Sequence, residues 1–293
     1  MVRRGASAVL FAPLFSNPSL VEVGFGAIAP DTARIDGVLD SLGVDLSDVS
    51  VILSGHGHYD HLMDVPRVME RHAPRARLLA NATSKRQLAP WGLDARITVV
   101  DDSVGDQRAA GRWIRIGDVR VMAFRSYHAP HFDGNLLFHG HHERDLDEPP
   151  PTALEWLDGN TVSYLVDFLE NGQPVFRMFY QDAVAAAPYG LVTPSLLSGG
   201  PDARPVDVAV LVPSTFAEVP WHPEATVDGL RPRHVFLGHW EDLFASPFEE
   251  PRPLGFMNDF GHFGARLQRA LEAVGAPRGA WHMPVAGARF EIR

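Results

Sequence analysis

The sequence predicts a layered α/β sandwich, and three observations support this expectation. Short apolar runs of strand type recur in both halves of the chain, amphipathic helical stretches lie between and after them, and no linker divides the chain cleanly. With 293 residues, of which 45% are hydrophobic, the chain is long enough to bury the core of such a sandwich. We therefore expect one domain over residues 1–293 rather than separate domains.

The first expected elements are a strand at SAVLFA (7–12) and a helix at 30–43. Apolar residues recur at i, i+3, i+4 and i+7 along the helix, so one of its sides is apolar. Asp31 can cap the start of this helix, and Gly43 suits the residue that ends it.

A second strand, DVSVIL (48–53), runs directly into SGHGHYDHL (54–62). The next stretch, MDVPRVMERHAP (63–74), is predicted to be helical, with Asp64 as its cap and Pro66 in its first turn. A dense group of histidines therefore falls at a strand-to-helix junction.

The remaining elements follow the same apolar patterns. A last helix is expected at about 262–274, with Gly275 at its end. Further strands are expected at 79–81, 97–100, 113–116, 119–124, 161–167, 174–180, 206–212 and 234–237.

The least regular region is 133–160, DGNLLFHGHHERDLDEPPPTALEWLDGN. Its charge and its three consecutive prolines exclude a continuous core element, so we expect a surface excursion near the ends of the strands. We interpret it as a lid-like insertion, with an apolar underside formed by Leu136, Leu137, Phe138, Leu154 and Trp156.

Charge and composition exclude several classes of function. The formal net charge of -10 argues against a nucleic-acid partner, because binding to phosphates usually needs a clustered basic face. No apolar run approaches the roughly 20 residues of a membrane span, and the start lacks a signal-peptide pattern. We expect a cytoplasmic protein with a small-molecule substrate, unless a segment upstream carried an export signal. The oligomeric state is not indicated.

The stretch 54–62 crowds four metal-binding side chains into six positions: His56, His58, Asp60 and His61. On extended backbone His56 and His58 point the same way, and the other two follow where the chain turns into a helix, so all four can converge. Packing so many polar groups costs several kcal/mol unless an ion or a network compensates. The spacing therefore predicts a metal site rather than a polar turn. Because the chain has no cysteine, histidine and carboxylate must supply the ligands.

This motif matches the HxHxDH hallmark of the metallo-β-lactamase superfamily, which the sequence resembles over most of its length. Three later segments match further marks of the family in order. SYHAPHF supplies His128, FRMFYQDAV supplies Asp182, and HVFLGHWEDLF supplies His239. The resemblance implies a four-layer αββα sandwich.

The resemblance also implies seven ligands for two divalent metal ions. One ion takes two histidines of the motif and a later histidine. The other takes the aspartate and last histidine of the motif and the final histidine, and one more carboxylate bridges both ions. In that order the ligands are His56, His58 and His128; Asp60, His61 and His239; and Asp182. Zinc is the expected ion, and manganese or iron tolerates the same ligands.

The implied activity is hydrolysis by a dinuclear centre in which a hydroxide that bridges the metals is the nucleophile. Asp60 and Asp182 are the expected catalytic carboxylates, with Asp60 orienting the hydroxide and receiving its proton. The forms HYDHL and GHWEDLF are similar to the branch that includes N-acylphosphatidylethanolamine phospholipase D. That similarity implies an ester, lactone or phosphodiester substrate with an apolar portion.

Two alternatives of other classes stay open at this point. The chain could be a non-catalytic metal-binding module of the same fold, or an iron-dependent oxidoreductase. Within the site, His131 competes with His128 as the third histidine, although the spacing after strand 119–124 favours His128. Three histidines of the excursion could also reach the metals, but a solvated loop is the simpler interpretation for His139, His141 and His142.

Overall fold

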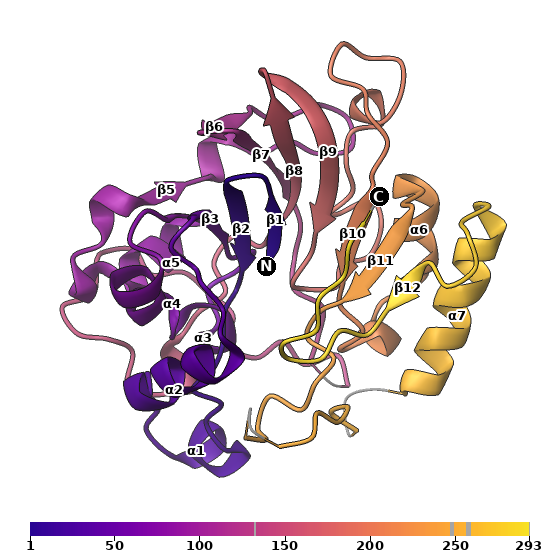
Figure 1. Ribbon diagram of the computed structural model, residues 1–293. Coiled ribbons are helices and arrows are strands. Elements are labelled where there is room, and N and C mark those ends of the chain that lie inside the picture. Colours follow the sequence, from indigo (N-terminus) through magenta and orange to yellow (C-terminus); the bar gives the residue numbers. More distant parts are fainter. Residues whose placement is uncertain (132, 247–248, 256–258, 293) are drawn as a thin grey trace.

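The computed structural model describes residues 1–131, 133–246, 249–255 and 259–292, and this part of the chain forms two β-sheets (Figure 1). The first sheet has five strands in the order β1-β2-β3-β4-β5, parallel except for the β1–β2 pair. The second has seven strands in the order β12-β11-β10-β9-β8-β7-β6. It is parallel from β12 to β9 and antiparallel from β9 to β6.

The strands lie close to their predicted positions, and β12 is an edge strand that the sequence did not reveal. The first sheet consists of β1 (Val2–Arg4), β2 (Ser7–Phe11), β3 (Val49–Leu53), β4 (Arg77–Ala80) and β5 (Ile97–Val99). The second consists of β6 (Ile114–Ile116), β7 (Val119–Arg125), β8 (Val162–Glu170), β9 (Gln173–Tyr180), β10 (Val208–Leu211), β11 (His234–Leu237) and β12 (Trp281–His282).

Helices of several lengths connect the strands. The α-helices are α1 (Leu20–Phe25), α2 (Thr32–Leu42), α3 (Tyr59–Leu62), α4 (Val65–Arg67), α5 (Ala82–Gln87), α6 (Glu224–Leu230) and α7 (Phe260–Ala273), and a π-helical turn follows α4 (Val68–His72). Single 3₁₀ turns lie at Ala89–Trp91, Asp94–Arg96, Asp101–Ser103, Ala153–Glu155, Pro194–Leu196 and Phe216–Glu218. The predicted ends of α2 are confirmed, because Asp31 accepts the Arg34 N–H and Gly43 has φ 57°.

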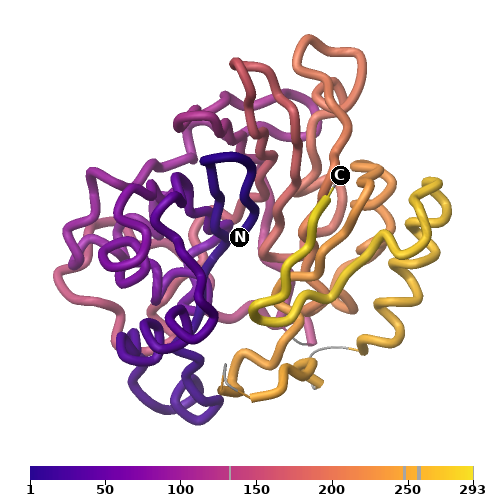
Figure 2. The backbone as a smooth tube through the Cα atoms, in the orientation of Figure 1, coloured from indigo at the N-terminus to yellow at the C-terminus, as the bar shows by residue number. Residues whose placement is uncertain are grey.

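Apolar side chains fill three layers. Residues that face inward from both sheets form one cluster between them, including Val9 and Leu53 from the first sheet and Val121 and Tyr164 from the second. Because side chains alternate along a strand, the outer face of each sheet is apolar as well. Helices α2, α3 and α4 cover the first sheet, and α6 and α7 cover the second (Figures 1 and 2). The chain is therefore a four-layer αββα sandwich, as predicted.

One prediction about the helix at 63–74 is wrong. Asp64 makes no side-chain cap, because the helical turn already begins at Tyr59 and the chain continues through α4. Its buried carboxylate instead accepts hydrogen bonds from Phe15 N (2.6 Å), Ser16 N (2.8 Å) and Ser16 Oγ (2.5 Å). Asp64 thus holds the loop after β2 against the helix that carries the histidine cluster.

The excursion 133–160 is irregular, as expected, but part of it is buried. Trp156 is 1% exposed and, with Ala153, belongs to the core on the outer face of the first sheet. Phe138 packs against the same core, whereas Leu154 is 65% exposed. The predicted apolar underside therefore holds for Phe138 and Trp156 and not for Leu154. Among the described residues, no helix combines the length and apolar character needed to cross a bilayer.

Candidate metal centre

The histidine motif lies in a loop that joins the end of β3 to α3, and close backbone approaches shape this loop. Gly55 N–H donates to Asp182 Oδ2 (2.6 Å), and Gly55 O accepts the N–H of Val162 in β8 (2.8 Å). A Cβ added at Gly55 would lie 2.1 Å from Asp182 Oδ1 and 2.6 Å from Val162 O. Gly57 is similarly confined, since its Cβ would lie 2.2 Å from Leu157 O. Only glycine fits either position.

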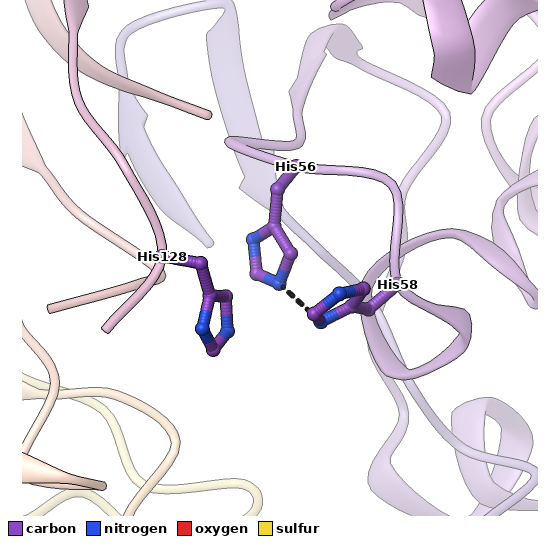
Figure 3. A group of neighbouring side chains, drawn as sticks. All are labelled: His56, His58 and His128. Carbon is purple, nitrogen blue, oxygen red and sulfur yellow. Dashed lines mark hydrogen bonds between the residues drawn. The ribbon is translucent and has the colours of Figure 1, made fainter. Parts of the chain in front are cut away.

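The first group of side chains joins His56, His58 and His128 (Figure 3). His56 Nε2 lies 3.1 Å from His58 Nδ1, so these two nitrogens face one point. The other nitrogens of the group are engaged outside it. His128 Nδ1 donates to Ala129 O (2.6 Å), and His58 Nε2 lies 3.3 Å from Phe138 O. These outer contacts leave His56 Nε2, His58 Nδ1 and His128 Nε2 to share a ligand.

The second group joins Asp60, His61 and His239. Asp60 Oδ2 lies 3.2 Å from His61 Nε2 and 3.0 Å from His239 Nε2. His239 follows β11 and has φ 52°, a left-handed conformation that turns the chain at the end of the strand. Its carbonyl accepts the Ser214 hydroxyl (2.9 Å), which fixes this turn. The ends of β3 and β11 thus supply the second group from opposite sheets.

Asp182 follows β9 and touches one histidine from each group. Its Oδ1 lies 3.1 Å from His56 Nδ1, and its Oδ2 lies 3.5 Å from His61 Nδ1. Tyr180 Oη donates to Oδ2 at 3.1 Å, in addition to the Gly55 N–H. The buried Tyr180 at the end of β9 therefore helps to hold this carboxylate in place.

Burial and neighbouring charges shift the pKa values in opposite directions. Burial holds the pKa of His56 and of His58 well below the usual value, and it lowers that of His128 to about 4. Burial also acts to lower the pKa of His61, but the carboxylates of Asp60 and Asp182 outweigh it and raise that pKa to about 9. The first group is therefore made of neutral imidazoles, the form that binds metal.

The residues fit a divalent metal ion on geometry and on chemistry. The ligand atoms of each group lie within 4.8 Å of one another. Two nitrogens bound tetrahedrally to one zinc lie about 3.3 Å apart, close to the 3.1 Å between His56 Nε2 and His58 Nδ1. The buried His61 Nδ1 has no hydrogen-bond partner within the described ranges. A bound ion would offset the cost of burying this set of polar atoms.

The structure brings together all seven side chains that the sequence singled out. The competing histidines are outside the candidate ligand groups. His131 stacks on His128 with 4.6 Å between ring centroids, and its Nδ1 accepts the Leu137 N–H. His139 pairs with the buried Asp158 (2.9 Å). Asp158 was missed, although its carbonyl also accepts the Gly57 N–H (2.9 Å). The Asp-Gly pair in LDGN, a common turn sequence, was the available signal.

Replacing Gly55 by Ala tests the close approach at the motif loop. We expect Gly55→Ala to lower the metal content of the purified protein and its thermal midpoint, because the new methyl group overlaps Asp182 and the backbone of β8. Gly37→Ala in α2 is the matched control, since its Cβ meets nothing within 4 Å. A Gly55→Ala protein with the metal content and midpoint of the Gly37→Ala control would show that the loop has room.

Comparison with known proteins found similar chains only among solved structures. No protein-family model and no curated protein sequence matches the chain. Igni18, described as a novel metallo hydrolase from the archaeon Ignicoccus hospitalis, is 13% identical with a TM-score of 0.48, covering 83% of this chain and 81% of that one. Zn²⁺-bound PqqB from Methylobacterium extorquens is 11% identical with a TM-score of 0.44, covering 89% and 85%.

A third similar structure is CmlA, a diiron β-hydroxylase from Streptomyces venezuelae, with 12% identity, a TM-score of 0.43 and coverage of 81% of this chain. This chain covers only 44% of CmlA. At these identities and TM-scores the similarities carry no argument about this chain, so its function is inferred from its own residues and architecture. The structure gathers the HxHxDH side chains and their three later partners at the ends of the strands of an αββα sandwich, which is the arrangement that the resemblance implied.

Proposed function

We propose that this protein is a metal-dependent hydrolase that cleaves an ester, lactone or phosphodiester at a centre of two divalent ions. The observation that carries the proposal is the convergence of side chains from four separate segments into two adjoining groups joined by Asp182. Zinc is the ion we expect, because histidine and carboxylate ligands in groups of three suit it.

The proposed ligands follow the two groups. His56, His58 and His128 would hold one ion, and Asp60, His61 and His239 the other. We assign the shared carboxylate to Asp182, because it lies beside one histidine of each group.

A pair of bound divalent ions supplies Lewis acidity and lowers the pKa of water toward neutrality. The chain's own residues keep this arrangement in place. Gly55 N–H and Tyr180 Oη fix the orientation of the Asp182 carboxylate, and the outer contacts of His58 and His128 fix their rings. Asp60 is ionised and can orient the nucleophilic water as an acceptor, because His61 and the hydrogen bond from His239 overcome the effect of burial and hold the pKa of its carboxyl well below the usual value.

We also propose that the excursion 133–160 covers the centre and selects substrates. The Phe138 ring lies 5.5 Å from the His58 ring and 5.7 Å from the His131 ring. The Phe138 carbonyl is 3.3 Å from His58 Nε2, so the excursion directly contacts the first group. A covering segment of this kind discriminates between substrates through their non-reacting parts.

Metal analysis distinguishes the two candidate third histidines. We expect two zinc ions per chain in wild-type protein purified without added metal, and about one fewer in His128→Ala, because that variant removes a ligand of the first group. His131→Ala is the matched control and should keep both ions. If His131→Ala loses the ion and His128→Ala does not, the assignment of the third ligand is wrong. Iron in place of zinc in the wild-type protein would favour redox chemistry over hydrolysis.

Asp182→Asn tests the shared carboxylate. We expect hydrolysis of a model ester to fall by about 10- to 100-fold or more, because a neutral amide cannot supply the charge that the two ions share. The fold should persist, since the change is nearly isosteric, and far-ultraviolet circular dichroism would check it. Glu170→Gln, which removes a charge from an exposed pair with Arg4, is the control. Wild-type turnover and metal content in Asp182→Asn would contradict the proposal.

Replacing residues 139–151 by a short Gly/Ser linker tests the excursion. The replacement leaves Phe138 and the buried Trp156 in place. We expect relative rates across a panel of esters and phosphodiesters to change, while metal content stays near that of wild type. An unchanged substrate profile would show that this segment is only a surface loop.

A further inference from the structure

A cavity of about 970 Å³ lies between the two sheets and opens onto the metal centre. Its volume is at the upper end of the range for small-molecule sites, about 300–1,000 Å³. Side chains of the second group, Asp60, His61 and His239, line one end, together with Asp182. A molecule bound in this cavity would therefore lie beside the metal centre.

The apolar part of the cavity wall comes from the inner faces of both sheets, and the loop 42–46 and the C-terminal segment 284–292 complete the lining. Strand β2 lies across from β10 and β11 (Figure 1), and the cavity is lined by Phe11 on the side of β2 and by Val210 and Phe236 on the side of β10 and β11. These side chains pack against the central core but are only partly buried. In a close-packed sandwich the inward-facing residues of central strands are buried. Their partial exposure shows that the space between β2 and the β10–β11 pair is not completely filled, although Phe11 contacts Tyr180 of β9 with 4.7 Å between ring centroids.

The cavity is elongated along the strands. Phe176 and Tyr180 both line it and are four residues apart on β9, a separation of about 13 Å. Asp182, at the metal end, lies two residues beyond Tyr180. The opposite end is lined by Arg3 and Arg4 at the turn of the β1–β2 hairpin.

The charges at this far end already have partners. Arg3 pairs with Asp48 at 2.7 Å and Arg4 with Glu170 at 3.0 Å. Between the two charged ends the strands present phenylalanine and valine side chains. These strand side chains offer no hydrogen-bond partner, so along them an apolar chain loses less hydration energy than a polar or ionised one.

We propose that this cavity binds an unbranched acyl chain of the substrate and presents its carbonyl carbon to the metal centre. The inference rests on the proposed hydrolase function and names its substrate class, an acyl ester. In the reaction the oxygen of one water forms a bond to the carbonyl carbon, the ester C–O bond breaks, and a proton from the water goes to the departing alkoxide. The products are an alcohol and a fatty acid whose chain occupies the cavity.

Two carboxylates that differ only in chain length test the binding site apart from catalysis. Isothermal titration calorimetry of the purified metal-containing protein with decanoate and with butanoate compares the same head group on long and short chains. Each buried methylene strengthens binding by about fourfold, so we expect decanoate to bind at least tenfold more tightly. A smaller preference overturns the proposal.

Substitution of Val210 tests whether the acyl chain binds in this cavity. Val210→Trp should abolish the preference for decanoate by filling the cavity between Phe11 and Phe236. Val21→Trp is the control, because Val21 is 71% exposed on α1 and does not line the cavity. If Val210→Trp does not fold, Val210→Phe should reduce the preference by at least threefold. A decanoate preference that survives in every folded Val210 variant contradicts the placement.

Hydrolysis of p-nitrophenyl esters with chains of two to twelve carbons separates this proposal from the proposed function. We expect kcat/KM to rise with chain length in wild type and in Val21→Trp, and to stay flat in the Val210 variants while the acetate ester is still cleaved. Decanoate binding without cleavage of any ester or phosphodiester would reject the hydrolase and leave the apolar site. Ester cleavage without dependence on chain length would reject the acyl site and leave the hydrolase.

Discussion

The contact between the motif loop and the second sheet is the constraint on which the site depends. The loop leaves β3 in the first sheet, yet Gly55 bonds through its N–H to Asp182 and through its carbonyl to Val162, both of which belong to the second sheet's strands or their ends. Tyr164 of β8 adds a hydrogen bond to Ser54 O (2.9 Å). These contacts join the two sheets where the ligands meet. Any side chain at position 55 would overlap Asp182 and the carbonyl of Val162, and it would force the two sheets apart.

Electrostatics explains why so many ionisable groups can be buried together at this contact between the sheets. Burial favours the neutral form of every one of them, and it holds the pKa of His56 low and raises that of Asp182. Asp60 and His61 depart from this trend because they stabilise each other's charged forms. The cluster thus combines neutral imidazoles in one group with an aspartate–histidine ion pair in the other. Binding of cations would displace the proton on His61 and take over the stabilisation of both carboxylates.

The sequence was sufficient for the fold class and for which side chains converge. The reason is physical: apolar runs of strand length, such as that at β3, report burial between layers, and four ligands within six positions have few uses other than metal binding. The role of Asp64 was misjudged because a local cap and a long-range acceptor have the same sequence pattern. Its partners Phe15 and Ser16 are nearly fifty residues away. The short edge strand β12 was missed because two residues carry no measurable periodicity.

The cavity could not be predicted from the sequence for a related reason. Phe11, Val210 and Phe236 follow the alternating pattern of any sandwich core, and that pattern is the same whether the opposite sheet is in contact or several ångströms away. The distance between the two sheets is set by the contacts of Gly55 and by the packing of the Phe11 ring against the Tyr180 ring, with 4.7 Å between ring centroids. Leaving apolar walls apart forgoes packing energy that a closed core would gain. The αββα layers supply that stability elsewhere, in the outer cores beneath the helices, so the inner faces are free to enclose a chain that ends at the metal centre.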